Sequence, residues 1–202
     1  MICMEQLTEF SWKGDGAMEV AILEEFLCRG LPNLKKLDIE IKYHSYHAMP
    51  PWPRALESCN WPHLRSVRLV SPSGRSFESV EKFLAQHPHL EELSYYLNTD
   101  NHSAFTQQFL PNLRVLRTTL YHFRALLPKI LSTALDTIEI NHMYWEGITH
   151  VTSALNGHPA QSIAHLVFEP LVTNGDYNSL VAELPGLKSI NGVSYEGDVE
   201  LL

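Results

Sequence analysis

The chain has 202 residues, 45% of them hydrophobic, and its 15 Lys and Arg against 23 Asp and Glu give a net charge of −8. Its length fits one domain or two small ones. No stretch approaches the roughly 18 apolar residues of a membrane span. The Lys and Arg residues are scattered singly, which argues against nucleic acid or an anionic membrane as a partner. The three cysteines, Cys3, Cys28 and Cys59, are widely spaced with no C-x-x-C pair, which disfavours disulfides and favours a reducing compartment, the cytoplasm or nucleus.

A short phrase with apolar residues at L-x-x-L-x-L spacing recurs along the whole chain, at intervals that average about 26 residues, which is typical of a solenoid repeat. Its first residues are Leu7, Leu34, Leu64, Leu90, Leu113, Leu135, Ile163 and Leu187. Proline lies two residues earlier in five phrases, at Pro32, Pro62, Pro88, Pro111 and Pro185. Because proline fixes φ and lacks an N–H, it suits the turn between a helix and a strand. We therefore predict eight short strands.

The segments between the phrases predict short helices. The clearest covers residues 17–29, closed by Gly30, with a buried face made of Val20, Ile22, Leu23, Phe26 and Leu27. Further helices are expected at 55–58, at 76–86 with Ser76 and Ser79 as rival caps, at 103–109 as a helix or 3₁₀ turn, at 121–131 broken at Pro128, at 144–156 and at 177–184.

Strands that alternate with helices predict an α/β fold with a parallel sheet. We expect one domain over 1–202, a right-handed solenoid of about eight irregular repeats, with the sheet on the concave side and short helices on the convex side. The alternative is a two-layer α/β domain whose strands merely share a pattern. Because the chain starts directly on a strand phrase, we also expect another segment to cover the first repeat, or the chain to be the back part of a longer protein.

A candidate partner surface follows from strand alternation, because the residues between the apolar positions point away from the core. On the concave face we select Lys36, Asp38, Glu40, Arg68, Glu92, Tyr96, Arg117, Glu139, Asn141 and His165. Arg68 and Arg117 flank Tyr96, and Arg and Tyr are frequent hot-spot residues of protein interfaces. The alternative is a solvated face whose Glu and Arg pair with each other. The loops after the strands, 12–16 and 43–47, offer a second surface on one rim.

No catalytic or metal-binding motif is complete in this sequence. The histidines include an H-x-x-H pair at His44 and His47 and an H-x-H pair at His87 and His89, but zinc sites need three or four ligands. Several histidines precede a strand phrase, which favours a role in turns. No P-loop, G-x-S-x-G, G-x-G-x-x-G or H-E-x-x-H motif occurs. We expect no enzyme, no cofactor and no metal.

The phrases Leu-Pro-Asn-Leu-Lys-Lys-Leu-Asp-Ile at 31–39 and Leu-Pro-Asn-Leu-Arg-Val-Leu at 110–116 resemble leucine-rich repeat proteins. The irregular periods and proline-led phrases are similar to the divergent repeats of F-box proteins, particularly fungal ones. The resemblance implies a repeat domain that holds the protein substrate of a ubiquitin ligase. Contact with the ligase adaptor would need an F-box, which this chain does not show. The alternative is a free-standing structural or scaffolding repeat protein without a ubiquitin role.

Overall fold

The computed structural model describes residues 4–14, 17–28, 30–41, 55–71, 77–97, 105–141, 147–156, 162–173 and 177–194. Its strands are β1 (Glu9–Gly14), β2 (Lys36–Ile41), β3 (Ser66–Ser71), β4 (Glu92–Leu97), β5 (Val115–Thr119), β6 (Thr137–Asn141), β7 (His165–Thr173) and β8 (Ser189–Ser194). Its helices are α1 (Ala17–Cys28), α2 (Ala55–Ser58), α3 (Phe77–Gln86), α4 (Leu120–Leu126), α5 (Gly147–Leu155) and α6 (Tyr177–Glu183), with 3₁₀ turns η1 (Met4–Gln6) and η2 (Leu127–Lys129).

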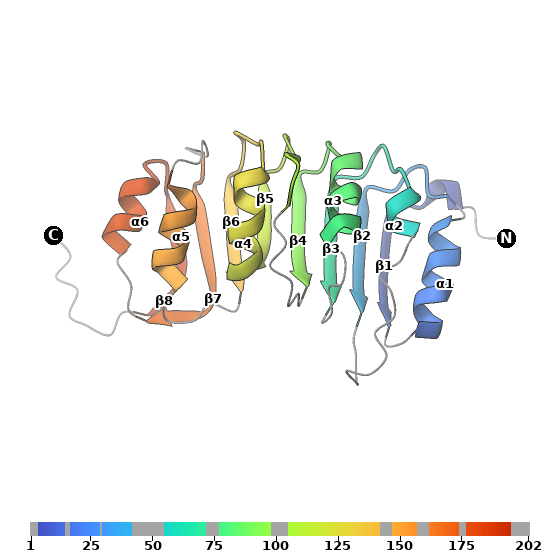
Figure 1. Ribbon diagram of the computed structural model, residues 1–202, viewed down its shortest axis with the longest axis horizontal. Helices are drawn as coiled ribbons and strands as arrows, with labels where there is room; N and C mark the ends of the chain where they lie inside the picture. The colour runs from blue at the N-terminus through green and yellow to red at the C-terminus, as the bar shows by residue number, and fades with distance from the viewer. Residues whose placement is uncertain are drawn as a thin grey trace.

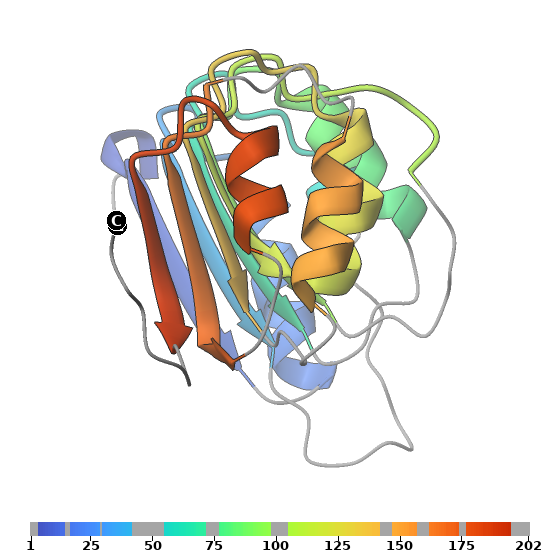
Figure 2. The same cartoon turned by 90° about the vertical axis from the view of Figure 1, so that its left-hand side faces the viewer.

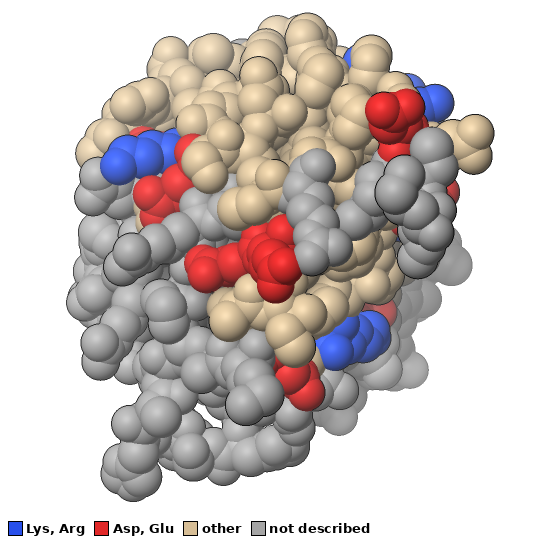
Figure 3. Space-filling view, turned by 90° about the vertical axis from the view of Figure 1, so that its right-hand side faces the viewer, with Lys and Arg blue, Asp and Glu red and all other residues tan. Residues whose placement is uncertain are grey.

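The strands form one parallel sheet in which every strand lies beside its neighbour in the chain, from β1 to β8 (Figure 1). Each of the eight predicted phrases supplies one of these strands, so the prediction of an α/β fold with a parallel sheet is confirmed. The helices α1 to α6 all lie on one side of the sheet, and none of them covers the other face, here called the open face (Figure 2). β1 forms the edge at the end of the molecule seen in Figure 3.

The core lies between the sheet and the helices. On β2 to β7 the two inward positions of each phrase are at most 1% exposed; they are Leu37, Ile39, Val67, Leu69, Leu93, Tyr95, Leu116, Thr118, Ile138, Ile140, Leu166 and Phe168. Thr118, the polar member, donates its hydroxyl to the carbonyl of Tyr95 at 2.8 Å, which satisfies it inside the core. Strand alternation therefore places the intervening residues on the open face.

A backbone motif repeats where each strand starts. The carbonyl of the phrase's second residue accepts hydrogen bonds from two consecutive N–H groups of the next phrase, first from Lys35 and Lys36 to Thr8 at 2.7 and 3.0 Å. The next six acceptors are Lys35, Arg65, Glu91, Arg114, Asp136 and Ala164. This shared geometry explains why phrases of different composition take the same register.

The proline-led phrases form turns, as predicted. In all five, the N–H of the first leucine of the phrase donates to the carbonyl of the residue before proline, as Leu34 does to Leu31 at 3.1 Å. Proline thus occupies the second position of a four-residue turn, where its fixed φ is favourable. The residue before each proline is buried; these residues are Leu31, Trp61, His87, Leu110 and Leu184.

The helices predicted at 17–29, 55–58, 76–86, 144–156 and 177–184 are largely confirmed as α1, α2, α3, α5 and α6. The break predicted at Pro128 is also confirmed, because α4 ends at Leu126 and Pro128 lies in η2. Ile22, predicted to be inward, is 60% exposed, because the buried stripe of α1 runs through Val20, Leu23 and Leu27 and leaves the opposite side in solvent. Ser79 lies inside α3 and is therefore not its cap. Ser76 and residues 142–146 lie outside the described residues.

The predicted helix or 3₁₀ turn at 103–109 is wrong for residues 105–109, which are not helical. Their backbone groups bond elsewhere. The Glu81 carboxylate on α3 accepts from the N–H groups of Thr106 and Gln107, both at 2.5 Å, and Phe109 forms a bridge with Ile130. Phe105 and Phe109 are buried, with ring centroids 5.3 Å apart, and the Phe105 ring also lies against Tyr95 of β4 with centroids 6.3 Å apart.

Candidate partner-binding face

The sheet register aligns the outward side chains of the open face in three rows. The first row is Glu9, Lys36, Ser66, Glu92, Val115, Thr137, His165 and Ser189. The middle row is Ser11, Asp38, Arg68, Ser94, Arg117, Glu139, Val167 and Asn191. The last row holds Lys13, Glu40, Val70 and Tyr96 on β1 to β4, and Thr119, Asn141 and Glu169 on β5 to β7. All ten predicted partner residues therefore share this face.

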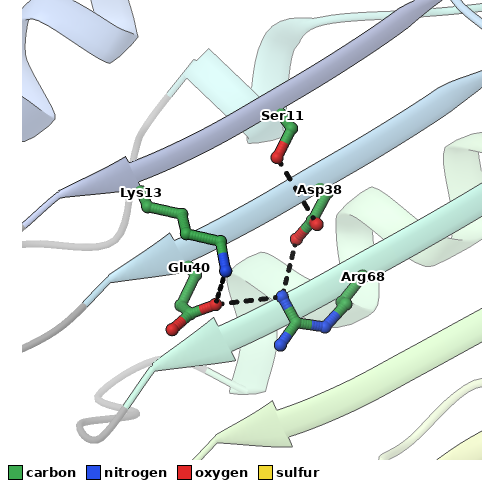
Figure 4. Close-up of polar contacts among 5 residues, drawn as sticks. All are labelled: Ser11, Lys13, Asp38, Glu40 and Arg68. Atoms are coloured by element: carbon green, nitrogen blue, oxygen red, sulfur yellow. Dashed lines mark hydrogen bonds and ion pairs between the residues drawn. The ribbon is translucent and has the colours of Figure 1, made fainter.

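The N-terminal half of the open face carries the Arg68 cluster, formed by Ser11, Lys13, Asp38, Glu40 and Arg68 (Figure 4). One guanidinium nitrogen of Arg68 lies 2.8 Å from Asp38 and 3.2 Å from Glu40. Lys13 Nζ reaches the same Glu40 oxygen at 2.9 Å, and the Ser11 hydroxyl lies 3.5 Å from Asp38. Two cations thus face two carboxylates, and the cluster is neutral.

Partial burial of Arg68 would by itself lower its pKa. Hydrogen bonds and charge from Asp38, and then from Glu40, act in the opposite direction and outweigh the effect of burial, so the pKa of Arg68 is raised. The guanidinium is therefore fixed as a cation that spans β2 and β3.

The centre of the face carries the Arg117 cluster, formed by Ser66, Glu92, Arg117 and Glu139. Arg117 Nε lies 3.1 Å from Glu139, and its terminal nitrogen lies 3.6 Å from Glu92. The Ser66 hydroxyl donates to Glu92 at 3.4 Å. One cation here faces two carboxylates, so this cluster is negative. The exposed Glu169 lies beside this cluster in the last row, so the part of the open face over β4 to β7 is acidic.

Tyr96 lies between the two arginines. Its pKa is raised to about 12, first by burial and then by the charge of Glu139, while Arg117 and Arg68 act in the opposite direction. The phenol is half-buried and keeps its proton near neutral pH, so it can donate a hydrogen bond. The predicted Arg–Tyr–Arg arrangement is therefore present.

The mutual Glu–Arg pairing of the alternative interpretation is also present, since each arginine contacts two carboxylates. These contacts were not individually predicted. A signal for them lies in the sequence, because Asp38 and Arg68, like Arg117 and Glu139, hold opposite charges at the same position of neighbouring phrases. Whether the face binds a partner stays a prediction.

The remaining predicted residues differ in their surroundings. Lys36 is exposed, and His165 Nδ1 lies 2.8 Å from the Ser189 hydroxyl of the next strand. Asn141 is half-buried, and its Oδ1 atom is buried without a hydrogen-bond partner among the residues described.

Cys59 and His87 each contact backbone groups of the fold. Burial raises the pKa of the Cys59 thiol to about 11, and its sulfur lies 3.6 Å from the Leu27 carbonyl. His87 is buried, with Nδ1 2.7 Å from the Phe83 carbonyl while Nε2 accepts from the Trp61 N–H at 3.2 Å. His44, His47 and the loop 43–47 lie outside the described residues. Within the described ranges no group of three or more His, Cys, Asp or Glu could hold a metal ion.

Comparison with family models and with curated proteins gave no match to this sequence. Over the described parts of the chain, the helices are too short or too polar to cross a membrane.

Proposed function

We propose that this chain is a right-handed leucine-rich repeat solenoid of about eight irregular repeats, and that its open face binds a protein. We further propose that it forms the substrate-recognition repeats of an F-box-like ubiquitin-ligase receptor. The observation that carries the first proposal is the open face, where eight strands in chain order present three rows of outward side chains opposite the helices. The resemblance of the phrases supports the second.

The size and chemistry of the open face suit a protein better than a small molecule. Strands about 4.8 Å apart give a sheet about 34 Å wide, which matches a small domain or an extended peptide. Tyr96 supplies a rigid half-buried ring, and Arg68 and Arg117 are already ordered by their carboxylates, so binding would cost little side-chain entropy.

The test places a photo-crosslinking phenylalanine analogue at Tyr96 on the open face and, as a matched control, at Tyr121, which is 38% exposed on α4. We expect partner adducts from position 96 and few from 121. Arg68→Ala combined with Arg117→Ala should weaken capture at least about tenfold, as the loss of hot-spot residues does. Arg124→Ala, on the exposed side of α4, is the matched control for lost charge. Adducts mainly from position 121 would disprove binding through the open face.

A free-standing scaffold protein is the second candidate, because the ion-paired open face also suits a constitutive contact. The two roles separate by the fate of the crosslinked partner. A ligase substrate should accumulate as ubiquitin conjugates when the proteasome is inhibited, and these should fall in the Arg68→Ala, Arg117→Ala variant. A partner whose ubiquitination and lifetime do not depend on this chain would favour the scaffold.

A further inference from the structure

The β1 edge of the sheet is less covered than any inner strand. Among the residues described, β1 pairs with β2 alone, so its other side carries unpaired backbone groups. Phe10 and Trp12 align with Leu37 and Ile39 of β2, which are 0% exposed, yet both aromatic residues are only half-buried. An exposed strand edge with partly exposed aromatic side chains is suited to pairing with another strand.

The apolar surface continues from β1 onto α1. The ring of Phe26 stacks on Phe10 with centroids 4.6 Å apart and planes 17° apart, and Ile22 on the same helix is 60% exposed. Figure 3 faces this end, and uncharged side chains cover much of its described surface, with acidic side chains among them. Uncharged and acidic side chains are therefore interspersed on the described surface of this end.

The sequence of β1 is complementary to itself. If two copies of Glu9-Phe10-Ser11-Trp12-Lys13 run antiparallel around Ser11, Glu9 of one copy lies opposite Lys13 of the other, and Phe10 lies opposite Trp12. The charged pair lies on the open face and the aromatic pair on the helix side, because this pairing keeps each residue on its own face. Opposite charges and aromatic pairs across strands both stabilise a sheet.

We propose that a second copy of this chain pairs its β1 with this β1, antiparallel about Ser11, in a dimer with one continuous sheet. The contact is isologous, so the dimer contains two Glu9–Lys13 pairs and two Phe10–Trp12 pairs. Lys13 can join it because its side chain is 59% exposed while it contacts Glu40. Glu19 and Glu25 are exposed on α1 at the same end, so the test uses salt near 0.15 M, which screens exposed charges of either sign.

The test measures the mass of the full chain by sedimentation velocity and light scattering from about 1 to about 300 µM at about 0.15 M salt. The monomer is 23.0 kDa, and we expect the mass to approach twice this value with rising concentration. Lys13→Glu and Glu9→Lys should each weaken dimerisation at least about tenfold, because like charges then face each other twice. The double variant Glu9→Lys, Lys13→Glu restores opposite charges and should recover the dimer to within about threefold.

The double variant separates the contact between copies from the contact within one chain, because it still lacks the native Lys13–Glu40 pair. Lys188→Glu, an exposed lysine just before β8 at the far end of the sheet, makes the same change of charge away from β1; it is the matched control and should leave dimerisation unchanged. Far-ultraviolet circular dichroism confirms that each variant is folded. A wild-type chain that stays monomeric to 300 µM, single variants that dimerise normally, or a mass that grows past the dimer would each overturn the proposal.

Discussion

The backbone at Gly192 on β8 lies so close to the neighbouring strand β7 that it leaves no room for a side chain. Its φ is +79°, and a Cβ atom added there would lie 1.8 Å from the carbonyl oxygen of Phe168 on β7. Only glycine avoids both the left-handed strain and this clash. The position coincides with the register shift between β7 and β8.

Gly192→Ala should therefore lower the free energy of unfolding by more than about 2 kcal/mol, since the left-handed backbone alone costs about 1 to 2 kcal/mol and the clash adds to it. Gly30→Ala is the matched control, because Gly30 has a φ of +83° but no atom within 4 Å of an added Cβ. Urea unfolding measures both. Equal losses in the two variants would show that β7 and β8 do not approach as closely as described.

Two histidines are buried in the core. His87 lies in a turn where other phrases have an apolar residue, and His122 lies in helix α4. His87 stands before Pro88 where Leu31 and Leu110 stand in other turns, and burial lowers its pKa. His122 on α4 is 1% exposed, its Nδ1 lies 2.9 Å from the Thr119 hydroxyl, and burial lowers its pKa to about 4. Both histidines are therefore neutral in the fold near pH 7.

The His122 shift predicts loss of stability in acid. The unfolded chain takes up a proton near pH 6.5 and the folded chain only near pH 4, so the contribution is complete above about pH 6.5 and falls as the pH drops towards 4. At pH 4.5 the loss from this residue is about 2 to 3 kcal/mol. His122→Phe, which keeps an aromatic ring beside Tyr95, should reduce the pH dependence of urea unfolding by that amount. Leu126→Ala on the same helix is the control and should lower the free energy of unfolding equally at neutral pH and at pH 4.5. If the free energy of unfolding of His122→Phe kept the pH dependence of the wild type, His122 would not be the group that destabilises the fold in acid.

At the scale of elements, the strands could be predicted because each phrase carries its own inward pattern and its own turn. Leu34, Leu37 and Ile39 specify one strand, and Pro32 specifies the turn before it, without reference to any distant residue. The open face follows from strand alternation, so the sequence could predict that the ten candidate residues lie on one face of the sheet. The sharing of Glu40 between Lys13 and Arg68 was not predictable, because it depends on which side chains reach across strands.

The segment 105–110 shows why the rest could not be predicted. Its composition allowed a helix, but its N–H groups are captured by Glu81 from α3 and by the Lys129 carbonyl, which are distant in sequence. A carboxylate with several short contacts in a buried site outweighs weak local helix propensity. The position of Ile22 is similar, since a helix that packs on a sheet by one stripe cannot bury apolar residues on its far side.

At the scale of the whole molecule, contacts run between neighbours. Each strand pairs with the adjacent strand, and helix contacts link α1 to α2, α2 to α3, α4 to α5 and α5 to α6. In such an array, stability is close to a sum of contributions from each unit and each junction between units, and end units lack one neighbour. The burial of inward residues reflects this, because Leu93 on β4 is 0% exposed while Phe10 on β1 and Ile190 on β8 are half-buried.

Native-state hydrogen exchange should therefore show the strongest protection in β3 to β6 and at least about tenfold faster exchange in β1, measured by mass spectrometry near 1 µM so that any dimer is dissociated. Leu93→Ala removes a fully buried side chain and should lower global stability by about 2 to 5 kcal/mol, with faster exchange in β3 and β5 as well as β4. Trp12→Ala should accelerate exchange in β1 and leave β4 unchanged, because the half-buried ring supports only the edge. Uniform exchange along the chain, with both variants acting everywhere alike, would mean that the sheet opens as one unit, and the description of the fold as a sum of neighbouring units would then be wrong.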